Sequence, residues 1–355
     1  MKATKDKKSG KWKIQYYYKD WKGNQKNSTK RGFRTKKEAE EWVRILLSQK
    51  QADFTINFGD FIGVYYEDIE TRIREHTMRT KKYIIDLKVL PYFKNMRISD
   101  IKASHIRTWQ NELMKQGYSE TYLKTINNQL SAILNHAVRF YELKSNPCKK
   151  AGSMGKSNAD TMQFWTKSEF DTFIEAVMNK NESYIAFMTL YWTGMRIGEL
   201  LALTASDIDT TKKTISITKS YQRFDKRDVI TEPKTPKSRR VISIPAFLAT
   251  DYEDYLSKLY DLNEGDRIFR FTKGYLTCEM KRGAKESGVK KIRLHDLRHS
   301  HASHLIELGF APVAIAERLG HEKVETTLNT YVHLYPNKQV EIANKLDEEY
   351  RKEIC

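Results

Sequence analysis

The first 50 residues alternate apolar and basic positions in a pattern that predicts a small sheet followed by a helix. Between Lys11 and Lys19, aromatic or β-branched residues alternate with basic ones, which is typical of a strand with one wet, cationic face. Residues 22–25 predict a turn, and residues 26–33 predict a second strand. Thr35 is a suitable N-cap for a helix that runs to about residue 50.

From about residue 58 to residue 146, apolar residues recur every three or four positions, the period of amphipathic helices. Pro91 is expected to end or bend one helix after Leu90, Gly117 ends a later one, and Ser119 begins another. The helix after Ser119 has one long apolar stripe, made by Leu123, Ile126, Leu130, Ile133, Leu134 and Val138. About four helices of this kind predict a bundle domain with its own core.

The remaining pattern predicts a multidomain protein that is mainly α with small β elements. Proline, glycine, serine and lysine after residue 146 predict an exposed, mobile linker. Beyond it, helices alternate with short strands, which we expect at 214–221, 229–231 and 239–244. The predicted domains are a sheet-plus-helix module at 1–50, a helical domain at 55–147, a linker at 148–162 and a mixed α+β domain at 163–355.

Composition and charge narrow the function classes. The 355 residues include 63 Lys+Arg and 45 Asp+Glu, and the resulting net charge of +18 favours a polyanionic partner, either nucleic acid or an anionic membrane. No apolar run reaches the roughly 20 residues of a membrane-spanning helix, and no signal-peptide pattern begins the chain, so we expect a soluble, unsecreted protein. Three widely separated cysteines, Cys148, Cys278 and Cys355, indicate free thiols in a reducing compartment.

The positive charge is concentrated at the beginning of the chain. Residues 1–37 hold 14 lysines and arginines against two aspartates, a net of +12. Aromatic residues such as Trp12 and Tyr16 are interleaved with these cations, which a merely solvated lysine-rich surface does not require. A small sheet can enter a major groove and place cations on phosphates, so the segment predicts a DNA-binding module.

Six of the nine histidines lie between residues 295 and 333. A metal site is disfavoured because four of them crowd one short stretch, the His-Glu-x-x-His pattern is absent and no cysteine is near. We therefore expect neither a metal ion nor another cofactor. We interpret His299, His301 and His304 as packing or capping residues, and His295 and His321 as hydrogen-bond donors at a phosphate site.

Four motifs in the second half of the chain surround these histidines. They are Thr193-Gly194-Met195-Arg196-Ile197-Gly198-Glu199, then His295-Asp296-Leu297-Arg298, then Leu319-Gly320-His321, and finally Tyr331, ten residues after His321. In this order and near this spacing they resemble the signature of the tyrosine recombinase (integrase) family. The resemblance implies that Arg196, His295, Arg298 and His321 surround one DNA phosphate and that Tyr331 is the nucleophile. It also implies a 3′-phosphotyrosyl bond and a free 5′-hydroxyl.

The chemistry of these residue types agrees with that resemblance. Cleavage of a phosphodiester by a protein nucleophile needs cations for the charge that develops on the non-bridging oxygens, and an acid for the leaving oxygen. Arg196 and Arg298 offer bidentate, permanently charged forks, and His295 and His321 can donate hydrogen bonds or transfer protons. The phenol of Tyr331 is both activatable and a tolerable leaving group, so the covalent bond preserves the energy needed for rejoining without ATP.

The general acid has several candidates. The family has a lysine in a β-hairpin between the first arginine and the His-x-x-Arg pair, and residues 232–240 resemble its Lys-Thr-x-x-Ser-x-Arg element. Lys234 is therefore the candidate, with Lys219 and Lys237 as alternatives. For the nucleophile, Tyr335 is the nearest competitor of Tyr331.

Glu199 and Asp296 neighbour the catalytic candidates and are interpreted as supports that orient arginine or histidine side chains.

The resemblance covers the whole chain. It implies an arm-site DNA-binding module at 1–50, a core-site DNA-binding domain at 55–147 and a catalytic domain whose C-terminal tail is exchanged between subunits. The implied function is integration and excision of a mobile element or prophage. The implied partners are double-stranded DNA with core-type and arm-type attachment sites, three further copies in a homotetramer, a host DNA-bending protein and an excisionase, but no membrane. The expected location is the cytoplasm, at the bacterial nucleoid.

Two other functions remain open at this stage. A type IB topoisomerase-like enzyme shares the chemistry but relaxes DNA instead of recombining it. A non-catalytic DNA-binding regulator could keep the fold, although all six candidate positions, from Arg196 and Lys234 to Tyr331, hold chemically competent residues.

Overall fold

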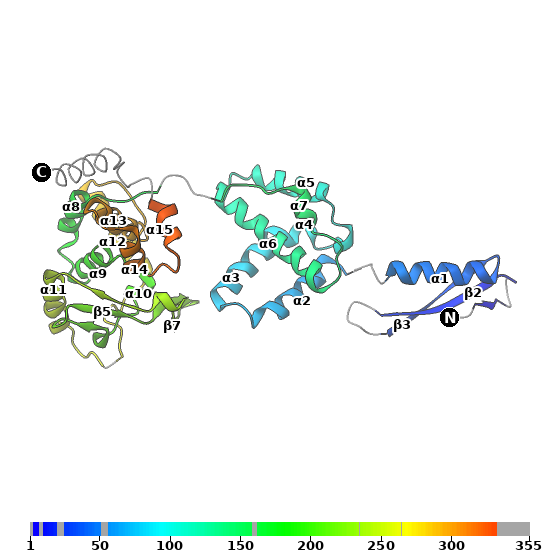
Figure 1. Ribbon diagram of the computed structural model, residues 1–355, viewed down its shortest axis with the longest axis horizontal. Coiled ribbons are helices and arrows are strands. Elements are labelled where there is room, and N and C mark those ends of the chain that lie inside the picture. Colours follow the sequence, from blue (N-terminus) through cyan, green and yellow to red (C-terminus); the bar gives the residue numbers. More distant parts are fainter. Residues whose placement is uncertain are drawn as a thin grey trace, which may run out of the picture. The chain divides into compact units, whose positions relative to one another are not determined.

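A computed structural model describes residues 3–6, 10–19, 25–50, 56–157, 162–233, 235–263 and 265–331 (Figure 1). The chain divides into two compact units, Met1–Asp160 and Thr161–Cys355. The fold is multidomain and mainly helical with small antiparallel sheets, as the sequence predicts. None of the helices in the described ranges is long and apolar enough to cross a membrane.

The N-terminal module is a three-stranded antiparallel sheet with one helix. Ile14 and Tyr16 are buried with Ala39 and Val43 of the helix, whereas Tyr17 on the opposite face of the sheet is 47% exposed, so the alternation of the sequence becomes a covered face and an open face. Glu38 N donates to the side chain of Thr35 at 3.1 Å, which caps the helix as expected. The elements are β1 (Thr4–Lys5), β2 (Trp12–Lys19), β3 (Gln25–Phe33) and α1 (Lys36–Lys50).

The helical domain has a continuous core that includes Phe58, Phe61 and Trp109. A π-helical turn, Ile85–Val89, ends two residues before Pro91. Proline has no N–H to donate and crowds the preceding turn, and the wider π turn accommodates it without ending the helix before Pro91. The helices are α2 (Phe58–Glu70), α3 (Glu75–Ile84), α4 (Leu90–Phe93), α5 (Ala103–Met114) and α6 (Glu120–Phe140), and Ser119 caps α6.

The linker prediction is wrong for its first part. Residues Pro147–Ala151 form a helix, α7, and Met154 is 3% exposed in the core of the helical domain. Gly155 has a φ of 72°, and a Cβ there would lie 2.0 Å from the Glu120 carbonyl oxygen. Gly155 is needed because the chain approaches α6 closely at this point. The small residues that suggested a mobile linker therefore allow tight packing. Residues 158–161 lie outside the described part.

The C-terminal unit combines helices with two small antiparallel sheets (Figure 1). One sheet has the order β4-β5-β8 and the other is the hairpin β6-β7, so the strand predicted at 214–221 is in fact two strands that belong to different sheets. The strands are β4 (Ile208–Asp209), β5 (Thr214–Ile217), β6 (Ser220–Phe224), β7 (Arg227–Thr231) and β8 (Arg240–Ser243). The helices are α8 (Lys167–Val177), α9 (Asn181–Thr193), α10 (Ile197–Leu200), α11 (Ala246–Ser257), α12 (Lys273–Ser287), α13 (Asp296–Glu307), α14 (Pro312–Leu319) and α15 (Val324–Tyr331).

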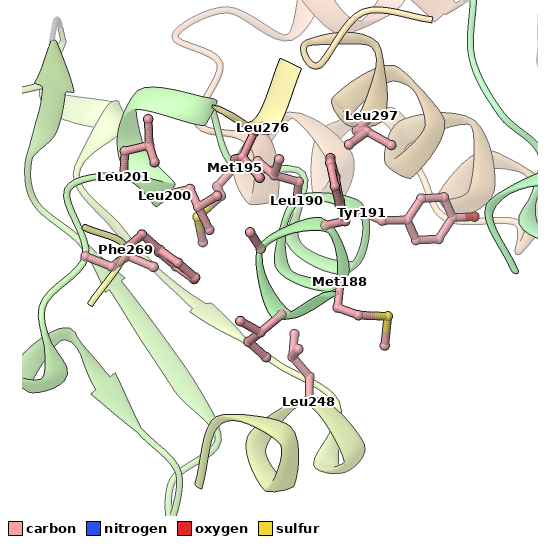
Figure 2. Close-up of a cluster of buried hydrophobic side chains, with 14 of the residues drawn as sticks. Met188, Leu190, Tyr191, Met195, Leu200, Leu201, Leu248, Phe269, Leu276 and Leu297 are labelled. Atoms are coloured by element: carbon pink, nitrogen blue, oxygen red, sulfur yellow. The ribbon is translucent and has the colours of Figure 1, made fainter. Parts of the chain in front are cut away.

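Helix α9 lies in the middle of the core of this unit (Figure 2). Nearly every side chain from Ile185 to Tyr191 is buried, so the helix is apolar all round. Side chains such as Leu190 and Met195 pack with residues from the other helices and the sheet. The end of α9 is thereby held rigidly, and the chain that follows it carries Arg196.

Candidate active site

A glycine turn positions Arg196. Helix α9 ends at Gly194, which has a φ of 65°, a left-handed conformation that disfavours other residues. A Cβ at this position would lie 2.6 Å from Cδ2 of His301 and 2.7 Å from Cδ2 of Leu319. The glycine of the Thr-Gly-x-Arg motif therefore lies at a close contact between the end of α9, α13 and the end of α14. The turn places Arg196 directly before α10.

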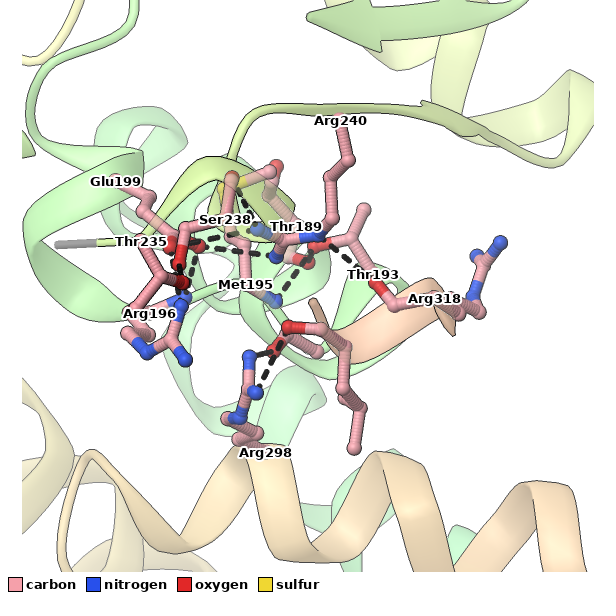
Figure 3. Close-up of polar contacts among 12 residues, drawn as sticks. Thr189, Thr193, Met195, Arg196, Glu199, Thr235, Ser238, Arg240, Arg298 and Arg318 are labelled. Atoms are coloured by element: carbon pink, nitrogen blue, oxygen red, sulfur yellow. Dashed lines mark hydrogen bonds and ion pairs between the residues drawn. The ribbon is translucent and has the colours of Figure 1, made fainter. Parts of the chain in front are cut away.

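Glu199 binds the side chain of Arg196. Nη1 of Arg196 lies 2.7 Å from Oε1 of Glu199, and the Arg196 backbone N–H donates to Oε2 at 2.9 Å (Figure 3). The carboxylate is only 3% exposed and also receives Nη2 of Arg240 at 3.0 Å. Burial raises the pKa of Glu199, but Arg240 and Arg196 outweigh burial and the pKa is lowered. A buried anion thus orients two cations, as the sequence suggests for Glu199.

Arg240 is a residue of the site whose position the sequence did not reveal. Its side chain is 8% exposed, and besides Glu199 it donates from Nε to the Arg318 carbonyl at 2.9 Å and from Nη1 to the Ser238 carbonyl at 3.1 Å (Figure 3). It therefore connects the segment after the β6-β7 hairpin, the end of α14 and α10. The only sequence signal was its place at the end of the Lys-Thr-x-x-Ser-x-Arg element.

Arg298 on α13 connects the first and third motifs. Nη1 donates to the Gly194 carbonyl at 2.9 Å and Nη2 donates to the Leu319 carbonyl at 2.8 Å. The residue is 4% exposed. Burial and the charge of Arg196 lower its pKa to about 9, so the guanidinium remains charged at neutral pH. Within the described ranges no carboxylate forms an ion pair with it, which leaves a buried cation suited to an anionic substrate.

The structure brings both candidate histidines toward these arginines. His295 directly precedes α13, and the protein packed around it, with the charge of Arg298, lowers its pKa. His321 follows the left-handed Gly320, and its Nδ1 lies 2.8 Å from Oγ1 of Thr327. Burial and the charge of Arg298 lower the pKa of His321 to about 4. Both imidazoles are therefore neutral at pH 7, the form that can donate one hydrogen bond and accept another.

Tyr331 is the last residue of α15 and is 1% exposed. Burial raises its pKa to about 12, although the charge of Arg298 acts in the opposite direction. Its hydroxyl lies 2.7 Å from Nδ1 of His299. The interpretation of His299 as a packing residue is therefore incomplete, because its imidazole contacts the candidate nucleophile. The contact joins α13 and α15, and sequence spacing does not reveal it.

The other two histidines of α13 have the packing role expected for them. His301 is 2% exposed and its Nε2 accepts a hydrogen bond from Nε of Arg318 at 3.0 Å. The ring of His304 packs against Trp192, with centroids 5.8 Å apart.

The lysine candidates differ in their contacts. Nζ of Lys219 lies 2.9 Å from Oδ2 of Asp207 and donates to the Thr204 hydroxyl at 3.0 Å, and Nζ of Lys237 donates to the Glu322 carbonyl at 3.1 Å. Both alternatives are thus engaged in protein contacts. Lys234 lies outside the described residues.

Tyr335 and the tail from residue 332 onward also lie outside the described residues. Among the described residues no group of three histidine, cysteine or acidic side chains could hold a metal ion.

Comparison with known proteins covers all three regions of the chain. Family models match for the phage integrase family at residues 163–338, the N-terminal SAM-like domain of phage integrases at 57–114 and an Arm DNA-binding domain at 3–50. The ICEBs1 integrase of Bacillus subtilis strain 168 is 35% identical over 308 residues, which is 83% of each chain. A XerC-like tyrosine recombinase of Caldanaerobacter subterraneus is 27% identical over 364 residues, which cover 89% of this chain and 90% of the relative.

Two solved structures share the fold. The Tn1549 transposon integrase in complex with transposon right-end DNA has a TM-score of 0.67 at 18% identity, and covers 83% of this chain and 99% of that one. A λ integrase dimer bound to a COC′ core site has a TM-score of 0.61 at 15% identity, and covers 93% of this chain and 94% of that one.

The chain belongs to the phage integrase family of tyrosine recombinases. It is an enzyme of site-specific recombination that breaks and rejoins DNA strands, and it serves the integration of mobile elements. These similarities do not favour the two alternatives, a type IB topoisomerase-like enzyme and a non-catalytic DNA-binding regulator.

Proposed function

We propose that Arg196, His295, Arg298 and His321 bind one DNA phosphate and that Tyr331 attacks it. The observation that supports this most strongly is the buried guanidinium of Arg298, which is hydrogen-bonded to carbonyls 104 and 21 residues away in the chain. These bonds gather three of the four motifs around a cation without an ion-pair partner in the described ranges. A phosphate oxygen that accepts from Arg298 and Arg196 supplies the missing negative charge.

The reaction that we propose takes its polarity and its general acid from the resemblance to the family. The phenol oxygen of Tyr331 forms a bond to phosphorus while the bond from phosphorus to the 5′-oxygen breaks, which leaves a 3′-phosphotyrosyl bond and a free 5′-hydroxyl. Lys234 protonates the leaving oxygen. The contacts of Lys219 with Asp207 and of Lys237 with a backbone carbonyl support this choice, because a lysine already held by the protein is less free to reach DNA.

The nucleophile is tested with a suicide DNA substrate that traps the covalent adduct. Tyr331→Phe should bind DNA and form no adduct, whereas Tyr335→Phe, its matched control, should keep both abilities. Adduct formation by Tyr331→Phe would refute the assignment.

The general acid is tested with a substrate that has a 5′-thio leaving group, which needs no proton. Lys234→Ala should cleave the normal substrate slowly and the thio substrate at nearly the wild-type rate. Lys219→Ala should show no such selective rescue. A defect of Lys234→Ala that is equal on both substrates would exclude Lys234 as the acid.

We further propose that residues 1–50 bind arm-type sites through the open face of their sheet. The strand register places Lys13 opposite Arg31, Gln15 opposite Thr29 and Tyr17 opposite Asn27, all on the face that α1 does not cover. The cations at one end of this face can bind DNA phosphates, and the amide side chains of Gln15 and Asn27 can hydrogen-bond to adenine edges in a major groove. The double variant Gln15→Ala/Asn27→Ala should lose arm-site specificity in a binding assay while core-site cleavage continues.

The helical domain at 55–147, extended by α7, is then the core-site DNA-binding domain, and the unit from 163 onward is catalytic.

Assembly is proposed as a homotetramer on DNA, because strand exchange between two duplexes requires four cleavages. The C-terminal tails are proposed to be exchanged between subunits. A solved λ integrase tetramer bound to a Holliday junction, with a TM-score of 0.60 at 16% identity, supports the proposal that a protein of this fold can form a tetramer on DNA. A host DNA-bending protein, an excisionase and a location at the nucleoid belong to the same proposal. Mass photometry on a synaptic DNA substrate tests the stoichiometry, and an excess of dimers on recombining DNA would refute it.

A further inference from the structure

The hydrogen bond between His299 and Tyr331 joins the candidate nucleophile to a group that can take its proton. Nδ1 of His299 lies 2.7 Å from the phenol oxygen, and the two ring centroids are 5.7 Å apart with the planes at 60°. This is the distance expected for proton transfer between a phenol and an imidazole.

The hydrogen bond also places the phenol oxygen on the face of α13 that belongs to the active site. His295 and His299 are four residues apart, so they share one face of the helix or its N-terminal extension. Their rings are in contact, with centroids 5.4 Å apart and planes at 84°. The side chains of Tyr331, His299 and His295 are therefore in contact one after another along this face.

The surroundings of His299 keep it neutral. Burial is the largest effect and, together with a smaller contribution from the neighbouring His295, lowers its pKa to about 4. At neutral pH the ring thus has one nitrogen with a free lone pair, and the phenol, with a pKa of about 12, still has its proton. The titratable and charged groups that face His299 are Arg293, His295, Asp296 and Arg298 from its own segment, Tyr331 from α15, and His321 after α14.

We propose that His299 is the general base of strand cleavage and takes the proton of Tyr331 as the phenol oxygen attacks phosphorus. The proposal rests on the nucleophile role of Tyr331. In the step, the O–H bond of Tyr331 breaks and an N–H bond forms at Nδ1 of His299, while the oxygen–phosphorus bond forms and the general acid protonates the leaving 5′-oxygen. In rejoining, the general acid takes back its proton from the 5′-hydroxyl as the 5′-oxygen attacks phosphorus. The bond from phosphorus to the phenol oxygen breaks, and the departing phenolate takes its proton back from His299.

The two pKa values keep the proton on the phenol in the absence of DNA. In the free protein the proton stays on the phenol, because values of about 12 and about 4 oppose its transfer. The charge of Arg298 is a smaller cause of the low pKa of His299 than burial is. A phosphate bound to Arg298 offsets this charge, which makes the imidazole a stronger base than in the free protein. The enzyme therefore contains no standing phenolate that could react without substrate.

The test measures single-turnover adduct formation on suicide DNA between pH 6 and 9, with fluorinated tyrosines of lower phenol pKa incorporated at position 331. His299→Gln keeps a hydrogen-bonding side chain but cannot take a proton. It should react about 10²–10⁴-fold more slowly at pH 7, the usual contribution of general base catalysis. Its rate should rise about tenfold per pH unit, because ionisation must then precede attack. Fluorination should restore much of the loss.

Several outcomes would overturn the proposal. A wild-type rate in His299→Gln would do so, and so would a slowing that is equal at every pH and insensitive to fluorination, since that pattern indicates positioning alone. The matched control His304→Gln, on the same helix and away from Tyr331, should leave the profile unchanged. If His299→Gln does not fold, the fluorotyrosine series with His299 intact decides: a rate that rises tenfold per pH unit there would exclude an internal base. Failure of the nucleophile assignment is separate, because Tyr331→Phe would then still form adduct.

Discussion

Removal of the charge of Glu199 should weaken both the fold and the catalytic site. Glu199→Gln keeps the size of the side chain and leaves Arg196 and Arg240 without their shared anion. Arg240 is 8% exposed and Glu199 is 3% exposed, so this pair is buried, whereas Arg196 is 38% exposed.

The magnitude follows from that difference in exposure. Breaking a buried ion pair by removing one partner costs roughly 3–5 kcal/mol, and the half-exposed Arg196 adds little because water screens it. We therefore expect the free energy of unfolding to fall by about 3 kcal/mol. At about 2–4 °C per kcal/mol for a domain of this size, the Tm should fall by about 6–12 °C. Adduct formation should slow by about 100-fold, because a misplaced guanidinium costs that much in orientation.

The dependence on pH gives a second readout of the same change. The folded-state pKa of Glu199 is lowered, so its contribution is fully present above the unfolded pKa of about 4.3 and is lost as the pH falls through the folded value. The difference in Tm between wild type and Glu199→Gln should therefore shrink in acid below about pH 4. Differential scanning calorimetry and the suicide-substrate assay measure the two effects.

The matched control is Asp209→Asn, whose ion pair with Lys212 at 3.0 Å lies on the surface. It should leave Tm and cleavage unchanged, because exposed pairs contribute little. If Glu199→Gln behaved like Asp209→Asn in both assays, the shared carboxylate would have no role in orienting Arg196.

Three further predictions concern other parts of the structure. Gly194→Ala should lower the free energy of unfolding by about 2–3 kcal/mol in chemical denaturation, because backbone strain and a clash act together. Gly265→Ala should lose less stability, because Gly265 has a φ of 93° but open space around it. Equal losses in the two variants would argue against the close contact at Gly194. A maleimide should label exposed Cys278 and spare Cys148 in the native protein, because burial raises the pKa of Cys148 to about 12. Peptide mass spectrometry measures the labelling, and equal labelling of the two cysteines would contradict the burial of Cys148. The lowered pKa of His321, about 4, means that the unfolded state binds more protons between about pH 6.5 and 4, so Tm should decrease with falling pH over that range. The decrease should be smaller in His321→Gln, and an unchanged slope would show that the pKa is not lowered.

Much of the local structure was predictable because its causes lie within a few residues. Thr35 and Ser119 start helices by accepting hydrogen bonds from the backbone three residues later, at 3.1 and 3.4 Å. The alternation around Ile14 sets which face of the sheet is buried. The first part of the linker after α6 was predicted wrongly because glycine and proline permit both a mobile chain and a close turn, and only contact with Glu120 distinguishes the two.

The sequence by itself determined the domain types, the order of the motifs and the chemical identity of the residues proposed for the site. The tertiary structure decided how these residues are connected: Arg240 shares Glu199 across 41 positions of the chain, and His299 contacts Tyr331 across 32. The pattern of residues along the chain predicts the periodicity of apolar positions and the capping of helices, and both depend on residues within one or two helical turns. Which cation shares a buried anion, and which imidazole meets the phenol, depends on how helices pack around α9, and that arrangement follows from the whole core rather than from neighbours in sequence.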